Sequence, residues 1–427
     1  MSNSFADSLR TNGIKYTFVP LARNLNAMFY EPVTENEKSL IAILVMHPGT
    51  DYLTKDMYLM ARYGYRVLCA DVTDIRENLD KKIAEAKKAV EFLRGCESVK
   101  NIVLWGHSGG GTLLSAYQKI AENGAASCQG DEKIHKCSDE LDGLPAADGL
   151  MLIDSNWGNA VMSLLSVDPA VTDENGLSPL DPELDLFNPA NGFDPDGSTF
   201  SDEFIKKFQK AQGERNNRII DNALSRLQKI ENGESFYIDD EPLNVIGAAQ
   251  GFMNNKLYAQ DIRLLSYTRK PCTLVHRGGV TTTEIVHTMR GPENKTSFTR
   301  TYSEGVLLTS VRNYLSEFAI RTLPDYGYNE DSLWGVDWSS TYSTPVGNVE
   351  SIKVPTLVMG MTAGWEYIAS ETIYEHSASS DKHLAFVEGA THIYKTMRGG
   401  EEKYGNAMDT IFDYVDKWLS APGRYID

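Results

Sequence analysis

Residues 101–114, NIVLWGHSGGGTLL, run from an apolar stretch into a group of glycines around Ser108. Gly106 and Gly110 stand two positions before and two positions after this serine, and helix-compatible residues follow. A serine on so tight a turn, between a buried strand and a helix, is typical of a nucleophile elbow. The strained backbone of that turn and its close neighbours leave no room for side chains at the flanks. The stretch therefore predicts an exposed serine hydroxyl beside the first N–H groups of a helix.

Strand and helix patterns alternate on both sides of this turn. The run at residues 39–46 is apolar almost throughout, as in a strand that is buried on both faces. Further strands are expected at 14–33, 65–70, 101–105 and 149–154, and helices at 52–63, 79–94 and 109–122. This alternation predicts an α/β fold with a mostly parallel, doubly wound sheet.

The alternation stops near residue 155 and resumes near residue 354. After the interruption, strands are expected at 355–360 and 383–387, and helices at 369–378 and 402–419. We therefore expect residues 1–154 and 351–427 to form one core, and residues 155–350 to form a mainly helical cap. Within the cap we expect amphipathic helices at 201–232, 241–259 and 303–321, a hairpin over 272–287, and an aromatic-rich loop over 324–345.

Bulk composition restricts the class of function. A net charge of −18 over 427 residues disfavours nucleic acid and anionic membranes as partners, because both require concentrated Lys and Arg. No apolar run reaches the roughly 18 residues of a membrane span, and the N-terminus lacks the pattern of a secretory signal. A cytoplasmic location is the resulting expectation.

Of five cysteines, Cys128 and Cys137 flank a polar loop, where they are either free thiols, a pair, or neighbours of a metal beside His135.

A serine nucleophile needs a base, and the base needs an acid that orients it. In this type of sheet the partners follow in the order Ser, then Asp or Glu, then His, on loops after later strands. His392 comes a few residues after the last predicted strand and is the candidate base. His107, inside the elbow, is expected to be structural.

The acid is expected in the loop after the strand at 355–360. Glu366 is the only carboxylate in that loop, MTAGWEYIAS, and is our candidate. Its other interpretation is a solvated residue at the start of the next helix. Asp154, directly after the preceding strand, is the alternative acid, because it could reach the same histidine from a neighbouring loop.

Two backbone N–H groups are needed to hold an oxyanion. Gly109, which follows the nucleophile, is expected to supply the first. The second is expected from the loop after the early buried strand, His47-Pro48-Gly49-Thr50. Since proline has no N–H, Gly49 or Thr50 is the candidate there.

With these features the chain resembles the α/β-hydrolase superfamily. The resemblance covers roughly residues 14–154 and 354–420, where the H-P-G-T loop, the G-H-S-G-G elbow, the acid loop and the E-G-A-T-H loop occur in family order. It implies the fold of that superfamily and a hydrolytic serine mechanism. One departure concerns the acid: many relatives carry Asp where this chain has Ala363 and Gly364, and the role would then move to Glu366.

The cap is expected to form the substrate pocket. Trp157, Trp334 and Trp338 are candidate lining residues for a bulky small molecule, and the alternative is that they form the cap's own core. The sequence thus predicts a serine hydrolase of carboxylic esters, lactones or amides that needs no cofactor or metal. A small-molecule substrate is the expected partner, and a homodimer is left open. The alternatives are an acyltransferase with the same triad and a catalytically silent binding protein.

Overall fold

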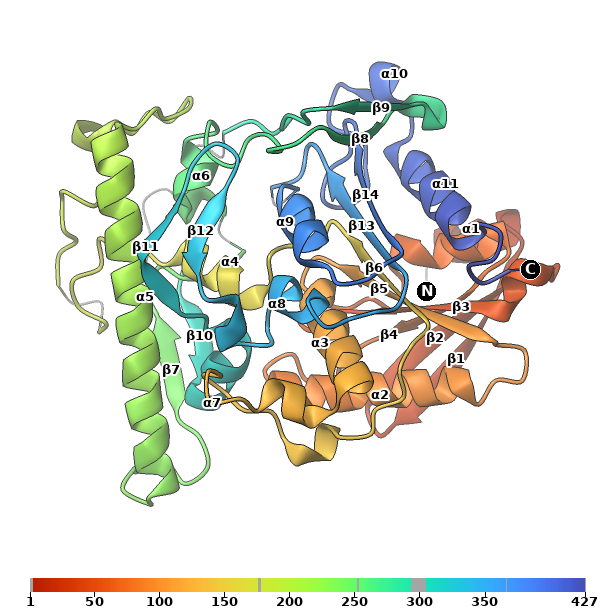
Figure 1. The fold of residues 1–427 in the computed structure, drawn as a ribbon, viewed down its shortest axis with the longest axis horizontal. Helices are drawn as coiled ribbons and strands as arrows, with labels where there is room; N and C mark the ends of the chain where they lie inside the picture. Colours follow the sequence, from red (N-terminus) through yellow and green to blue (C-terminus); the bar gives the residue numbers. More distant parts are fainter. Residues whose placement is uncertain (1–2, 176–177, 252, 293–304, 366, 427) are drawn as a thin grey trace.

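The computed structural model describes residues 3–175, 178–251, 253–292, 305–365 and 367–426. Its main sheet contains β1 (Ile14–Ala22), β2 (Leu25–Pro32), β3 (Ile41–Met46), β4 (Arg66–Ala70), β5 (Asn101–His107), β6 (Gly149–Ile153), β8 (Cys272–Val275), β9 (Thr281–Glu284), β13 (Thr356–Met361) and β14 (Lys382–Val387). The ten strands lie in the order β1-β2-β4-β3-β5-β6-β13-β14-β8-β9 (Figure 1). From β4 to β8 in this order all pairs are parallel. The predicted fold class, an α/β fold with a mostly parallel sheet, is confirmed.

Both faces of the central strands are buried, which explains their continuous apolar sequences. In β3, Leu44 and Met46 belong to the core cluster on one face, whereas Ile43 and Val45 belong to the cluster on the other. This alternation is the period of two that side chains have along a strand. Parallel strands need such cover on both faces because helical crossovers lie on each side.

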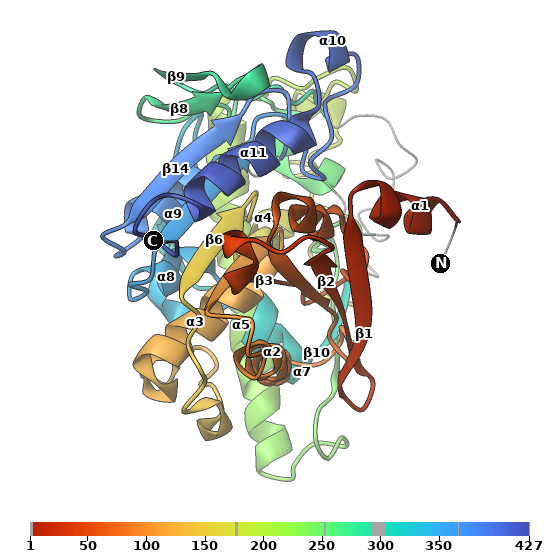
Figure 2. The same ribbon diagram turned by 90° about the vertical axis from the view of Figure 1, so that its right-hand side faces the viewer.

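Helices form a layer on each face of the sheet. One layer contains α2 (Leu79–Arg94), α3 (Gly110–Asn123), α8 (Pro345–Val349) and α9 (Ala369–His376), each in contact with the next. The other contains α1 (Asn3–Thr11), the 3-10 helix η2 (Asp56–Tyr63) and α11 (Ala407–Leu419). Figure 2 shows α1 beside β1. The helix expected at 402–419 is divided into α10 (Glu401–Tyr404) and α11, because Gly405 adopts a φ of +68° between them.

The other elements of residues 155–350, the segment that is named the cap, lie on the side of the molecule away from β1 and β2 (Figure 1). They are α4 (Asn159–Ser166), α5 (Asp202–Glu231), β7 (Pro242–Val245), α6 (Leu257–Gln260), β10 (Leu307–Ser310), α7 (Val311–Asn313), β11 (Thr322–Tyr328) and β12 (Leu333–Val336). The long α5 confirms the helix expected at 201–232. Its residues Ile219 and Ile220 share a separate core cluster with Val245 and Val311.

Three expectations for the cap need correction. The helix expected over 241–259 is wrong, since β7 occupies part of it and pairs with β10. β10 also replaces the start of the helix expected over 303–321, of which residues 303–304 lie outside the described residues. The aromatic-rich stretch at 324–345 contains a hairpin of β11 and β12. The partner of β7 is distant in sequence, so no local pattern indicated their pairing. β11 and β12 are close in sequence, and their aromatic residues are typical of strands.

The hairpin expected over 272–287 is confirmed, but it does not stay within the cap. β8 pairs in parallel with β14, and β9 pairs with β8 on its outer side. Residues 155–350 therefore contribute two strands to the main sheet. None of the described helices combines the length and the apolar character that crossing a membrane requires.

Candidate active site

Ser108 stands on a strained turn between β5 and α3. Its φ is +54°, a left-handed conformation that a serine rarely adopts. The two flanking glycines are needed for space. A Cβ on Gly106 would lie 2.7 Å from the Cα of Gly111, and one on Gly110 would lie 2.7 Å from the carbonyl oxygen of Met46. Helix α3 on one side and strand β3 on the other thus account for the glycine spacing around the serine.

The sheet topology brings the predicted partners of Ser108 to the same end of the sheet, where the parallel strands have their carboxyl ends. β5, β6, β13 and β14 are consecutive neighbours in the sheet and run in parallel. Ser108 directly follows β5, Asp154 follows β6, and His392 lies in the loop after β14. Carboxyl ends of parallel strands are where ligands bind in open α/β sheets.

Asp154 is fully buried and has both carboxylate oxygens bonded. His392 Nδ1–H donates to Oδ2 at 2.6 Å, and the backbone N–H of Met361 donates to Oδ1 at 2.8 Å. The Ser108 N–H also donates to the Asp154 carbonyl oxygen at 3.2 Å. Asp154 itself has a φ of +51°. Two strained residues on neighbouring strands are therefore joined through their backbones.

A glycine leaves the room that this carboxylate occupies. A Cβ on Gly364 would lie 3.0 Å from Asp154 Oδ2 and 3.0 Å from the carbonyl oxygen of Met361. The family departure at Ala363 and Gly364 thus coincides with a carboxylate that arrives from the neighbouring strand. Glu366, our first candidate for the acid, lies outside the described residues and stays a prediction.

The histidine loop is fixed to the elbow through His107. One ring nitrogen of His107, Nε2, donates to the His392 carbonyl oxygen at 2.7 Å, and the other, Nδ1, is bonded to the Tyr52 hydroxyl. Burial and the nearby His392 lower the pKa of His107 well below its usual range, which keeps this ring neutral. The expected structural role of His107 has its basis in these bonds.

Tyr394 fixes the same loop through hydrogen bonds to β5 and β6. Its hydroxyl donates to the Ile153 carbonyl oxygen at 3.0 Å and accepts a bond from Trp105 Nε1 at 3.1 Å. Its backbone is held at a φ of +62°. With Nδ1–H directed at Asp154, the neutral His392 ring keeps its lone pair on Nε2, the atom that a general base needs.

The predicted oxyanion donors lie in two loops. Gly109 begins the turn into α3, with a φ of −59°. Gly49 and Thr50 are exposed residues after β3. The Gly49 N–H donates to Nδ1 of His47 at 2.9 Å.

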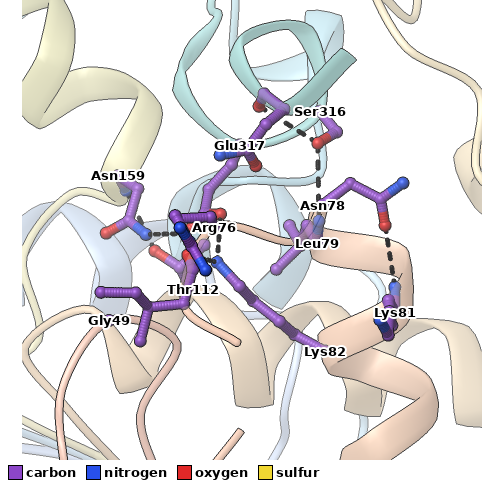
Figure 3. Close-up of polar contacts among 12 residues, drawn as sticks. Gly49, Arg76, Asn78, Leu79, Lys81, Lys82, Thr112, Asn159, Ser316 and Glu317 are labelled. Atoms are coloured by element: carbon purple, nitrogen blue, oxygen red, sulfur yellow. Dashed lines mark hydrogen bonds and ion pairs between the residues drawn. The ribbon is translucent and has the colours of Figure 1, made fainter. Parts of the chain in front are cut away.

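Figure 3 shows a cluster of polar side chains that includes Lys82, Asn159 and Glu317. Lys82 of α2 and Glu317 of the cap form an ion pair at 2.6 Å, with side chains only 1% and 2% exposed. Asn159 Nδ2 donates to Glu317 at 2.7 Å. A Cβ on Gly109 would lie 3.0 Å from Asn159 Oδ1. The cluster links the core, the cap and the start of α3, and no sequence pattern indicates it because its members are far apart in the chain.

The candidate pocket residues fall in different environments. Trp157 is buried in the main core cluster, where its indole N–H donates to Thr372 at 3.4 Å. Trp334 is 41% exposed, and Trp338 contacts the ring of His376. Within the described parts of the chain, no hydrogen bond or ring contact joins any of the three tryptophans to Ser108 or His392. Their pocket role stays a prediction.

The loop cysteines and His135 form no metal site within the described part of the chain. Cys128 and Cys137 are both buried free thiols. Groups of three or more potential metal-ligating His, Cys, Asp or Glu side chains are absent from the residues that the structure describes. His135 Nε2 lies 3.5 Å from a carboxylate oxygen of Asp80.

Comparisons with known proteins give structural neighbours only. The sequence matches no protein-family model and no curated protein. The siderophore hydrolase EstB from Aspergillus fumigatus is similar at 11% identity and a TM-score of 0.42, over 96% of this chain and 98% of that one. A soluble variant of monoglyceride lipase from Saccharomyces cerevisiae has 10% identity and a TM-score of 0.40, over 97% and 96%. Est1E from Butyrivibrio proteoclasticus has 12% identity and a TM-score of 0.38, over 95% and 97%. Identities this low assign no activity to the chain.

Proposed function

We propose that this chain, which has the α/β-hydrolase fold, is a serine hydrolase that cleaves a carboxylic ester or lactone. The observation that carries the proposal is the 2.6 Å hydrogen bond from His392 Nδ1–H to Asp154. The residue after Asp154's partner strand, Ser108, has a strained backbone and is bonded to the Asp154 backbone. Both residues follow the carboxyl ends of parallel strands, where ligands bind in open α/β sheets. A serine, a histidine base and an acid that orients the histidine are the groups that nucleophilic acyl transfer requires.

In the first half of the reaction, Ser108 Oγ attacks the carbonyl carbon while His392 Nε2 takes the hydroxyl proton. The Asp154 carboxylate stabilises the imidazolium that forms. When the tetrahedral intermediate collapses, the C–O bond to the leaving alcohol breaks and His392 returns the proton to that oxygen. An acyl group then remains on Ser108.

In the second half, water attacks the acyl-enzyme and gives its proton to His392. The bond between the acyl carbon and Ser108 Oγ then breaks, and His392 returns the proton to Oγ as the carboxylic acid is released. The N–H of Gly109 is one donor to the oxyanion in both intermediates, and the loop after β3 is the expected source of the other. The large cap favours a bulky small molecule as the substrate. We therefore expect the acyl group or the alcohol group of the ester to be bulky.

Labelling with a fluorophosphonate probe, together with turnover of p-nitrophenyl esters of graded acyl length, tests the proposal. We expect the unaltered chain to label and to turn over at least one ester. The Ser108→Ala variant should lose the label and reduce kcat by a factor on the order of 10⁵–10⁶. A folded chain that neither labels nor hydrolyses would overturn the proposal and favour a binding protein. Ester formation with an added alcohol, in place of hydrolysis, would indicate an acyltransferase.

A further inference from the structure

His47, the first residue after β3, has a defined tautomer. The backbone N–H of Gly49 donates to its Nδ1 at 2.9 Å, so this nitrogen must carry the lone pair. A neutral imidazole with a lone pair on Nδ1 carries its hydrogen on Nε2. The ring is held in place by stacking on Tyr52, with centroids 4.8 Å apart and planes at 17°. His47 therefore presents a fixed Nε2–H.

The same ring is kept neutral by its surroundings. Burial, followed by the charges of His392, Lys82 and Lys55, lowers the pKa of His47 to about 3. Neutrality has a chemical advantage at this position. His392 becomes a cation as Ser108 attacks, and a second cation beside it would oppose that step.

Nε2 of His47 lies beside the start of α3. A Cβ on Gly109 would lie 3.0 Å from His47 Nε2, so this nitrogen lies against the residue that supplies the first oxyanion donor. Among the described residues, no group is hydrogen-bonded to this nitrogen. The donor is thus available at the elbow.

The neighbouring groups cannot supply this donor as they stand. Asn159 also flanks Gly109, but its Nδ2 donates to Glu317 at 2.7 Å, so the oxygen of the amide faces the glycine. An oxygen acceptor repels an oxyanion. The N–H of Gly49 is engaged on His47 Nδ1, and turning it toward a substrate would break that bond.

We infer that the Nε2–H of His47, in place of the Gly49 N–H, is the second donor of the oxyanion hole. The inference rests on the proposed function and deepens it. A neutral imidazole can act as an electrophilic hydrogen-bond donor to a developing oxyanion. In this arrangement Gly49 is a positioning residue, because its N–H sets the tautomer of His47.

Two substitutions at His47 test the inference with p-nitrophenyl acetate as the substrate. Phe keeps a ring on Tyr52 but has no N–H, whereas Gln carries an N–H₂ near the position of Nε2. We expect His47→Phe to lower kcat about a hundredfold to a thousandfold with little change in KM. His47→Gln should stay within about tenfold of the unaltered chain, because a donor remains. His383→Phe, at a partly exposed histidine on β14, is the matched control and should leave kcat unchanged.

Binding of a trifluoromethyl ketone, which forms a tetrahedral adduct with Ser108, supplies a second measurement. Its inhibition constant should rise in His47→Phe by about the factor by which kcat/KM falls. Equal losses in the Phe and Gln variants, or a Phe variant close to the unaltered chain, would overturn the inference and return the donor role to Gly49. If the Phe variant does not fold, a loss in kcat of more than about a hundredfold in the Gln variant would overturn it as well. Absence of Ser108-dependent turnover in the unaltered chain would instead overturn the proposed function itself.

Discussion

Asp154 at the end of β6 and Asp168 after α4 are both buried aspartates, but they have different partners. The two oxygens of Asp154 receive one N–H each, from Met361 and His392. Asp168 receives the N–H of Ala170 on Oδ1 at 2.9 Å, and burial raises its pKa to about 6. The Asp154 carboxylate lies beside an imidazole at the carboxyl end of β6, whereas the Asp168 carboxylate is buried within the cap segment.

The difference between these two regions shows what distinguishes a candidate catalytic acid from a merely buried one. Burial disfavours the ionised form of any carboxylate. Hydrogen bonds to both oxygens offset that effect, and a histidine among the donors couples the charge to chemistry. Asp154 meets both conditions, and its place on the strand next to Ser108 completes the arrangement.

The largest effect is expected from Asp154→Asn. The amide cannot hold the required tautomer of His392, so kcat should fall by a factor of about 10⁴ with little loss of stability. Ester hydrolysis and thermal unfolding measure the two quantities. Asp168→Asn is the matched control and should leave kcat unchanged. If Glu366→Gln causes the large loss while Asp154→Asn does not, the acid lies in the loop after β13.

A smaller effect is expected from Gly364→Ala. The added Cβ would lie 3.0 Å from Asp154 Oδ2, so the carboxylate that bonds His392 would have to shift by a few tenths of an ångström. Because a misplacement of about 1 Å costs about a hundredfold, a shift this small should lower kcat by up to about tenfold. Gly95→Ala, at the end of α2, would bring its Cβ no closer than 3.4 Å to a neighbouring atom and should have no effect on kcat. Equal rates for both variants would contradict the role assigned to the space at Gly364.

The smallest effect concerns stability and pH at Asp168. Its raised pKa means that the folded state binds a proton more tightly than the unfolded state. Its contribution to stability is therefore full below the unfolded pKa of about 4 and is lost as the pH rises through about 6. Relative to Asp168→Asn, the unaltered chain should lose on the order of 2 kcal/mol of unfolding free energy between pH 4 and pH 7.

Urea unfolding at the two pH values measures this difference. Asp139→Asn, at an exposed aspartate, is the control and should show no such change. A pH-independent difference for Asp168→Asn would mean that folding does not shift the pKa of this carboxyl.

The core was more predictable from the sequence than the cap. The glycines around Ser108 encode contacts with β3 and α3 that any such turn must make, so their spacing alone indicated the elbow. β7 could not be foreseen, because its partner β10 lies much further along the chain and pairing supplies most of a strand's stability.

The candidate site shows the same limit. The order of the loops predicted His392, but which carboxylate faces its ring depends on the space that Gly364 leaves beside Asp154. A single sequence does not show that packing. In the loop that begins with His47, the sequence indicated only the backbone N–H groups of Gly49 and Thr50. The role of the His47 ring depends on its contacts with Gly49 and Gly109, which the sequence does not show.

The hairpin of β8 and β9 has a consequence for protein engineering. Because these strands come from the inserted segment, excising residues 155–350 as a block would strip two strands from the sheet and bare the backbone edge of β14. A bare edge of this kind recruits other chains and promotes aggregation. A graft that exchanges this cap for another should therefore retain residues 272–284 and replace the flanking segments separately.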